Sequence, residues 1–191
     1  MTEFPDSSSL DGQNQECKEY PVGYGVFRSW DPLMNRTVRE TAKLLAAVGQ
    51  RSDSSLDLVR ELGLPAEEEE QVLLELGCLQ RIAGHLSVVE AFSDSPETVE
   101  PLLTAYYEEW PKSSECDRRV HTSEEVYRRL PVYREAMRSA DEEGIIVSVG
   151  KAFARLCGNP DRNLTGLGSN VFGSASMKAS KLLEQVDLEA P

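Results

Sequence analysis

The stretch PAEEEEQVLLELGCLQRIAGHLSVVEAF, residues 65–92, decides the fold class of this 191-residue chain. Pro65 suits the first position of a helix, because its missing N–H would have no partner there. Glu67–Glu70 follow in the first turn, where the helix dipole favours negative charge. Apolar residues then recur at helical spacing and predict one buried face: Val72, Leu73, Leu76 and Leu79. We expect this helix to end at Gly84, and we expect His85–Phe92 to form a short strand or wing.

Two shorter helices are predicted before this stretch. TVRE, residues 37–40, is a capping box, in which the threonine oxygen accepts from a backbone amide and the glutamate reaches back. The helix that it opens is expected to end at Gly49. A second helix is predicted to start at Ser54 and to stop at Gly63.

Two further helices are predicted after it. Asp94–Pro96 begins a helix that runs to about Trp110. A second capping box, TSEE at residues 122–125, opens another helix. Pro131 should kink or interrupt that helix, because proline removes a hydrogen bond and clashes with the preceding turn.

The last part of the chain predicts a strand between helices. Ile145–Val147 are β-branched and follow a glycine, so we expect a short strand there. Ser148 then caps a helix through Leu156. Residues 158–174 are rich in glycine and asparagine and predict a loop or wing, and a last helix is expected over roughly Ala175–Val186.

Composition divides the chain into five predicted segments. They are a disordered tail over 1–19, an aromatic arm over 20–34, an acidic helical domain over 35–110, a polar linker over 111–122, and a helical, locally basic domain over 123–191. The fold class we expect is mainly α. It would have two small helical sub-domains, one or both winged-helix-like, with short β elements.

The charge is uneven along the chain. Twenty lysines and arginines against 33 aspartates and glutamates give a net charge of −13. Residues 1–110 hold 8 basic and 21 acidic side chains, whereas residues 111–191 hold 12 of each. Within the second half, residues 145–181 carry five basic side chains against one aspartate. A phosphate backbone would therefore be repelled by the first half and tolerated only near this stretch.

The sequence also predicts where the protein works. The lack of an apolar run of about 18 residues predicts no membrane span. The opening residues MTEFPDSSSL lack the basic and apolar regions of a secretory signal. The four cysteines are dispersed, which is typical of reduced thiols in the cytoplasm.

Catalytic and metal-binding motifs are weak. The cysteines and the two histidines are too scattered for a zinc site. His85 and His121 are the only candidates for a base at neutral pH, and no nucleophile motif accompanies either. Val149–Lys151 lacks the first glycine and the hydroxyl of a phosphate-binding loop. Gly166–Gly168 is a fragment typical of a turn. Because none of these motifs is complete, we expect a protein that is not an enzyme and uses no cofactor or metal.

The predicted order of helix, helix, turn, helix and short strand over residues 37–92 resembles winged helix-turn-helix regulatory domains. In such domains the N-terminal residues of the second helix of the pair enter the major groove of DNA. Here those residues include Glu67–Glu70, whose carboxylates would be repelled by phosphate. We therefore exclude DNA readout by this helix. Glu69 also stands where such motifs usually bury an aliphatic side chain, so a compact helical bundle without a wing is an equal alternative for the fold.

The second half resembles the small winged-helix domains appended to replication and to plasmid or phage regulatory proteins. The similarity rests on GKAFARL at residues 150–156, which follow a short apolar stretch. It implies that Lys151 and Arg155 lie near phosphate. Secondary nucleic-acid contacts would come from Arg162, Lys178 and Lys181.

Two functions follow as hypotheses. The first is a non-enzymatic regulator of the transcription or replication type, whose acidic first half binds protein and whose second half contacts nucleic acid weakly. The alternative is an oligomerising interaction or structural protein, such as an adaptor or a viral structural component, with no nucleic-acid role. Its anchors would be two groups of aromatic residues, because exposed aromatics are common at interfaces: Tyr24, Phe27 and Trp30, and Tyr106, Tyr107 and Trp110.

Overall fold

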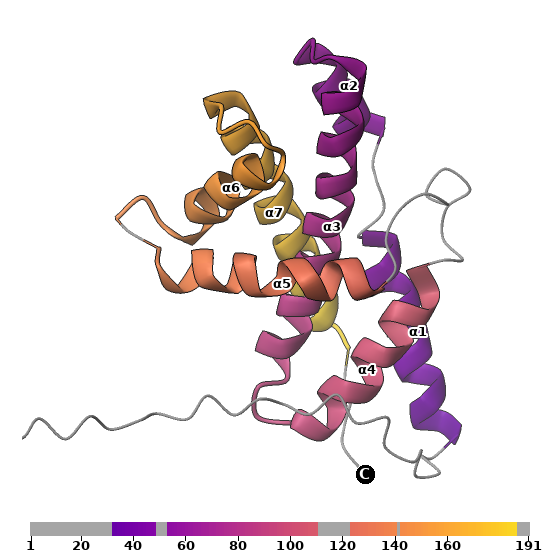
Figure 1. The fold of residues 1–191 in the computed structure, drawn as a ribbon. Coiled ribbons are helices and arrows are strands. Elements are labelled where there is room, and N and C mark those ends of the chain that lie inside the picture. The colour runs from indigo at the N-terminus through magenta and orange to yellow at the C-terminus, as the bar shows by residue number, and fades with distance from the viewer. Residues whose placement is uncertain (1–31, 49–52, 111–122, 141, 187–191) are drawn as a thin grey trace, which may run out of the picture. The chain divides into compact units, whose positions relative to one another are not determined.

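The computed structural model describes residues 32–48, 53–110, 123–140 and 142–186. In these residues the chain is mainly α, as expected, and forms seven helices with no strand among them (Figure 1). The helices are α1 (Pro32–Val48), α2 (Asp53–Glu61), α3 (Ala66–Ala91), α4 (Pro96–Glu109), α5 (Ser123–Arg138), α6 (Ile145–Leu156) and α7 (Arg162–Leu183). The predicted tail, most of the aromatic arm and the predicted linker lie outside the described residues.

Helix α3 is longer than the sequence predicts. It continues through Gly84 to Ala91, so the expected end at Gly84 and the expected strand or wing over His85–Phe92 are wrong. The physical reason lies in α4. A Cβ at Gly84 would collide with the hydroxyl of Tyr106, so the missing side chain lets the two helices approach rather than ending one of them.

The expected strand over Ile145–Val147 is also wrong. These residues form the first turn of α6, which starts directly after Gly144 with a φ of 90°. Likewise, the expected loop over residues 158–174 is wrong from Arg162 onward, where α7 begins. The carboxylate of Asp161 caps α7 by accepting from the backbone N–H of Asn163 at 2.7 Å.

The other helix boundaries vary in accuracy. The starts of α4 at Pro96 and of α5 at Ser123 agree with the prediction, and α5 continues without interruption through Pro131. In contrast, α1 begins at Pro32, so residues 37–40 lie inside that helix and do not cap it. Residues 32–34 belong to α1 rather than to an irregular arm.

The helices of the two predicted halves pack on one another. The most extensive pairings join α6 with α7, α3 with α7, and α1 with α4. Smaller contacts join α5 with α6, α1 with α7, and α3 with α5. Asp31–Pro191 is accordingly one compact unit, with a single hydrophobic cluster to which all seven helices contribute.

Helix α3 is the centre of this packing. Every residue from Glu75 to His85 is buried, so no solvent-facing side remains over that stretch. By length and composition alone α3 could cross a membrane, and no other helix in the described part of the chain meets both tests. However, 78% of its most apolar 18-residue window is buried inside the bundle, so packing accounts for its apolarity.

Small residues bring α6 and α7 together. A Cβ at Gly150 of α6 would collide with the carbonyl of Thr165 and with Ser169. A Cβ at Gly168 of α7 would lie 2.6–2.8 Å from three atoms of Phe153. The fragment Gly166–Gly168 is therefore part of a helix–helix contact, and the prediction that it forms a turn is wrong.

Two glycines of α7 provide a matched test of this packing. We expect Gly168→Ala to lower the free energy of unfolding by about 1–3 kcal/mol, because its Cβ would overpack against Phe153. Nothing lies within 4 Å of a Cβ at Gly166. We therefore expect Gly166→Ala to raise the free energy of unfolding by roughly 0.5–1 kcal/mol through helix propensity. Urea denaturation followed by circular dichroism measures both, and shifts of the same sign would contradict the close contact.

Candidate functional site: a buried polar cluster on α3

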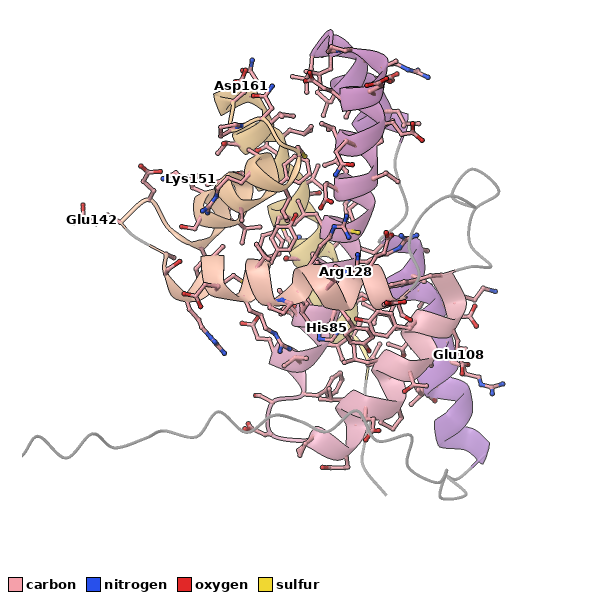
Figure 2. The ribbon with its side chains drawn as sticks, viewed as in Figure 1. His85, Glu108, Arg128, Glu142, Lys151 and Asp161 are labelled. Atoms are coloured by element: carbon pink, nitrogen blue, oxygen red, sulfur yellow. The ribbon has the colours of Figure 1, made fainter. Side chains whose placement is uncertain are left out.

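The buried stretch of α3 carries polar side chains that the bundle encloses. Glu75, Arg81 and His85 are all buried. Charged groups in an apolar interior are costly unless they are paired and hydrogen-bonded. The partners of these three residues come from α4 and α5, and together they form the main concentration of polar chemistry in the described interior (Figure 2).

Glu75 is paired with Arg129 of α5. The guanidinium Nε donates to both carboxylate oxygens of Glu75, at 2.6 and 2.9 Å. The side chain of Glu75 is 1% exposed and that of Arg129 is 17% exposed. Arg129 also donates to the carbonyl of Glu125, at 3.3 Å. The hydrogen bonds to Glu75 raise the pKa of the Arg129 guanidinium, so the two charges neutralise each other inside the protein.

Two thiols and a phenol lie in the electrostatic field of this pair. Burial raises the pKa of Cys78 and that of Cys157 to about 12. Both therefore remain protonated thiols at neutral pH and are not nucleophiles. The hydroxyl of Tyr133 is fully buried and has no hydrogen-bond partner among the described residues. Burial raises its pKa well above 10.

His85 lies between α4 and α5. Its Nδ1 is 2.6 Å from the hydroxyl of Tyr107, and its Nε2 is 3.5 Å from Nη2 of Arg134. Because a guanidinium can only donate, we assign Nε2 as the acceptor. Nδ1–H then donates to the oxygen of Tyr107, whose ring lies 5.1 Å from that of the exposed Tyr127 between centroids. The result is a hydrogen-bonded chain from Arg134 through the buried ring to Tyr107.

The imidazole of His85 is held neutral. Desolvation by burial, and then the positive charge of Arg134, lower its pKa from 6.5 to about 4. Both ring nitrogens are occupied by the chain described above, and no carboxylate among the described residues is hydrogen-bonded to the ring. The other histidine of the sequence, His121, lies outside the described residues.

The predicted aromatic anchors on α4 face inward. Tyr106 and Trp110 are buried and Tyr107 is half-buried, which corrects the expectation that they are exposed. The Trp110 ring meets the rings of Tyr107 and Tyr106 edge-on, at centroid distances of 4.3 and 4.9 Å. The guanidinium of Arg81 lies 4.9 Å from the centroid of Trp110, and Tyr106 donates to the carbonyl of Arg81. These rings hold α4 against α3. The other predicted anchors, Tyr24, Phe27 and Trp30, lie outside the described residues.

The predicted nucleic-acid contacts are divided between two regions. Lys151 and Arg155 are exposed one turn apart on α6, and Lys151 pairs with Glu143 at 2.8 Å. Lys178 and Lys181 are exposed on α7. Gly150, which precedes Lys151, lies against Thr165 and Ser169 of α7. Lys178 is about 14 Å further along α7 than Ser169, at a rise of 1.5 Å per residue. The structure does not bring Lys178 and Lys181 together with Lys151 and Arg155. Arg162 is the first residue of α7, and its side chain lies outside the described part.

The sequence contains a signal for the ion pair that our prediction missed. Glu75 lies three residues after Val72 and four before Leu79, in register with the predicted buried face of that helix. Arg129 likewise lies three residues after Val126, which is buried. A single acid in one apolar stripe and a single base in another indicate a buried pair.

The polar groups of the cluster are occupied by one another. Glu75 is occupied by Arg129, and the ring nitrogens of His85 are occupied by Tyr107 and Arg134. Among the described residues, no group of three or more histidine, cysteine, aspartate or glutamate side chains could hold a metal ion. No family model matches the chain, and no curated protein or solved structure matches it.

The ion pair can be tested with two neighbouring arginines of α5. We expect Arg129→Leu to lower the free energy of unfolding by about 3–5 kcal/mol, because it leaves the Glu75 carboxylate buried without its partner. Arg128 instead contacts Glu124 at 3.7 Å, between side chains that are 69% and 80% exposed. We therefore expect Arg128→Leu to change stability by less than about 1 kcal/mol. Urea denaturation compares the two variants.

A third variant separates the lost pairing from lost packing. Glu75→Leu combined with Arg129→Leu should recover most of the stability that Arg129→Leu loses, because apolar groups replace both charges. If the double variant were as unstable as Arg129→Leu, the buried charge would not be the cause.

The neutral state of His85 predicts an acid-sensitive stability. The unfolded chain binds a proton at His85 below its ordinary pKa of 6.5, whereas the folded protein does so only near 4. Stability contributed by the neutral ring is therefore present above 6.5 and lost as the pH falls towards 4, by at most about 1.4 kcal/mol per pH unit. Urea denaturation between about pH 5 and 7 should show this slope for the wild type and a shallower one for His85→Gln. His121 is common to both proteins, so equal slopes would mean that His85 is not the group responsible.

Proposed function

We propose that this protein acts by binding, as a self-associating helical interaction protein. The observation that carries the proposal is a set of large apolar side chains left exposed where α6 begins and on the adjoining part of α7. Ile145, Ile146 and Met177 are 47%, 49% and 53% exposed. Apolar side chains gathered on a surface mark sites where another surface docks.

The interior supports a binding role over a catalytic one. A general base needs an accessible, titratable group near the operating pH. His85 is buried with a pKa of about 4, and the thiols of Cys78 and Cys157 have pKa values of about 12. These groups are suited to holding the bundle together.

A regulator that touches nucleic acid is the second candidate. It is favoured by Lys151 and Arg155, which are exposed one turn apart on α6. Each phosphate that such residues neutralise would add a slope of about −0.9 to the logarithm of the affinity against that of the salt concentration. Against this candidate, Lys151 already pairs with Glu143, and α6 has neither wing nor strand beside it among the described residues.

One experiment separates the two candidates. Size-exclusion chromatography with light scattering of the full chain should give a stable oligomer whose mass is unchanged by added duplex DNA. A strict monomer that shifts on DNA in low salt, and no longer shifts in the variant Lys151→Glu/Arg155→Glu, would overturn self-association and establish the regulator instead. A strict monomer that ignores DNA would contradict both.

A further inference from the structure

We infer that a second copy of this chain docks on the α6–α7 apolar face, defined as Ile145, Ile146 and Met177. The inference rests on the proposed function and adds the surface and the partner. No residue of the buried polar cluster takes part in it. Three features of the described residues carry the argument: the register of α6, the contact between α6 and α7, and the local charge.

The register of α6 shows that its first residues belong to a buried stripe. Val149 and Phe153 on this helix are fully buried. Ile146 precedes Val149 by three residues, and Ile145 precedes it by four, so both lie on the side of the helix that Val149 occupies. They are nevertheless about half exposed. The apolar stripe of α6 therefore extends beyond the cover that the other described helices supply.

Helix α7 continues this apolar surface. The side chain of Ile146 lies over Gly173, because a Cβ built there would be 3.5 Å from its Cδ1. Met177 follows one turn later on the same side of α7, and its side chain is 53% exposed. Ile146 therefore packs on α7 one turn before Met177, which places exposed apolar side chains of both helices in one region.

The charge distribution favours a second copy over a strongly basic partner. Residues 142–186 carry five basic and four acidic side chains, a net of +1, whereas the whole chain carries −13. The other described residues, 32–48, 53–110 and 123–140, carry nine basic and 18 acidic side chains, a net of −9, so two copies repel each other over those helices. The α6–α7 region is where two such chains approach without that repulsion. A strongly basic partner would be drawn to the acidic remainder instead.

The α6–α7 apolar face has both an acidic and a basic residue near its edge, so its charges can pair with those of the same face on a second copy. Glu142 lies three residues before Ile145, at the tip of the turn between α5 and α6 (Figure 2). Lys181 is exposed one turn beyond Met177. A two-fold interface brings the same patch of both copies together, so it can set acidic groups of one copy against basic groups of the other while the apolar centres meet.

The test is the concentration dependence of the mass of the full chain, measured by sedimentation equilibrium. We expect the wild type to dimerise and Ile146→Glu/Met177→Glu to weaken the dimer at least about tenfold, since buried charge is unfavourable at an apolar centre. Leu58→Glu is the matched control, because Leu58 is 47% exposed on α2, outside the α6–α7 apolar face. It should leave the dissociation constant unchanged, and circular dichroism should show that every variant is folded.

A disulfide cross-link gives a second measurement that does not depend on weakening the dimer. In a Cys17→Ser/Cys116→Ser background, Met177→Cys should form a covalent dimer under mild oxidation, whereas Leu58→Cys should not. The buried Cys78 and Cys157 are common to both proteins. Cross-linking at position 58 with none at position 177 would overturn the choice of face.

The outcomes distinguish this inference from the proposed function. If the wild type dimerises and Ile146→Glu/Met177→Glu dimerises equally well, the face is wrong but self-association stands. If the wild type stays monomeric up to about 100 μM, its dissociation constant lies far above the roughly 1 μM that corresponds to a binding free energy of about −8 kcal/mol, and both are overturned.

Discussion

The buried ion pair between Glu75 and Arg129 is the constraint on which the arrangement of the helices depends. A carboxylate that is 1% exposed must keep its partner within hydrogen-bond distance. That requirement fixes α5 against the centre of α3. Because α5 leads into α6, and α6 packs along α7, which itself packs on α3, the ion pair and the contact between α3 and α7 together position the second half of the chain on the first.

The described helices share one core, which is centred on α3. Helix α3 is buried on all sides from Glu75 to His85, and α1, α4, α5, α6 and α7 all contact it or one another. At its other end, the buried polar groups of α3 meet α4 through the Arg81–Trp110 contact and the bond between His85 and Tyr107. The buried polar groups of α3 are therefore paired helix by helix, Glu75 with α5 and His85 with both α4 and α5.

The sequence predicted the elements that local chemistry decides. Pro96 at the start of α4 and the pattern at residues 122–125 predict the starts of α4 and α5 correctly, because such start signals involve neighbours within four residues. The prediction failed where a tertiary contact determines whether a glycine ends a helix or lies inside one. Gly84 looked like a helix end, but it makes room for Tyr106, and Gly168 makes room for Phe153. Tyr106 and Phe153 are distant in the sequence from the glycines that they contact, so the local pattern does not reveal these contacts.

The candidate site was predictable only in part, for a related reason. A lone acid and a lone base in apolar stripes are visible in the sequence, but Glu75 and Arg129 are 54 residues apart. Nothing in either stripe says that the two stripes meet. The tautomer of His85 is likewise decided by Arg134, which lies 49 residues away and can only donate. The sequence therefore indicates the inventory of polar groups, while the fold decides their pairing.

The close packing of α6 and α7 links the interior to the surface. Glycines at positions 150 and 168 bring the two backbones together, and α6 begins near the level of Gly173 on α7. Beyond that level α7 continues for more than two turns to Leu183 without α6 beside it. Ile145, Ile146 and Met177 lie at this step between a short helix and a long one. Their exposure is therefore a consequence of unequal helix lengths, and any surface that covers them must fit against both helices at once.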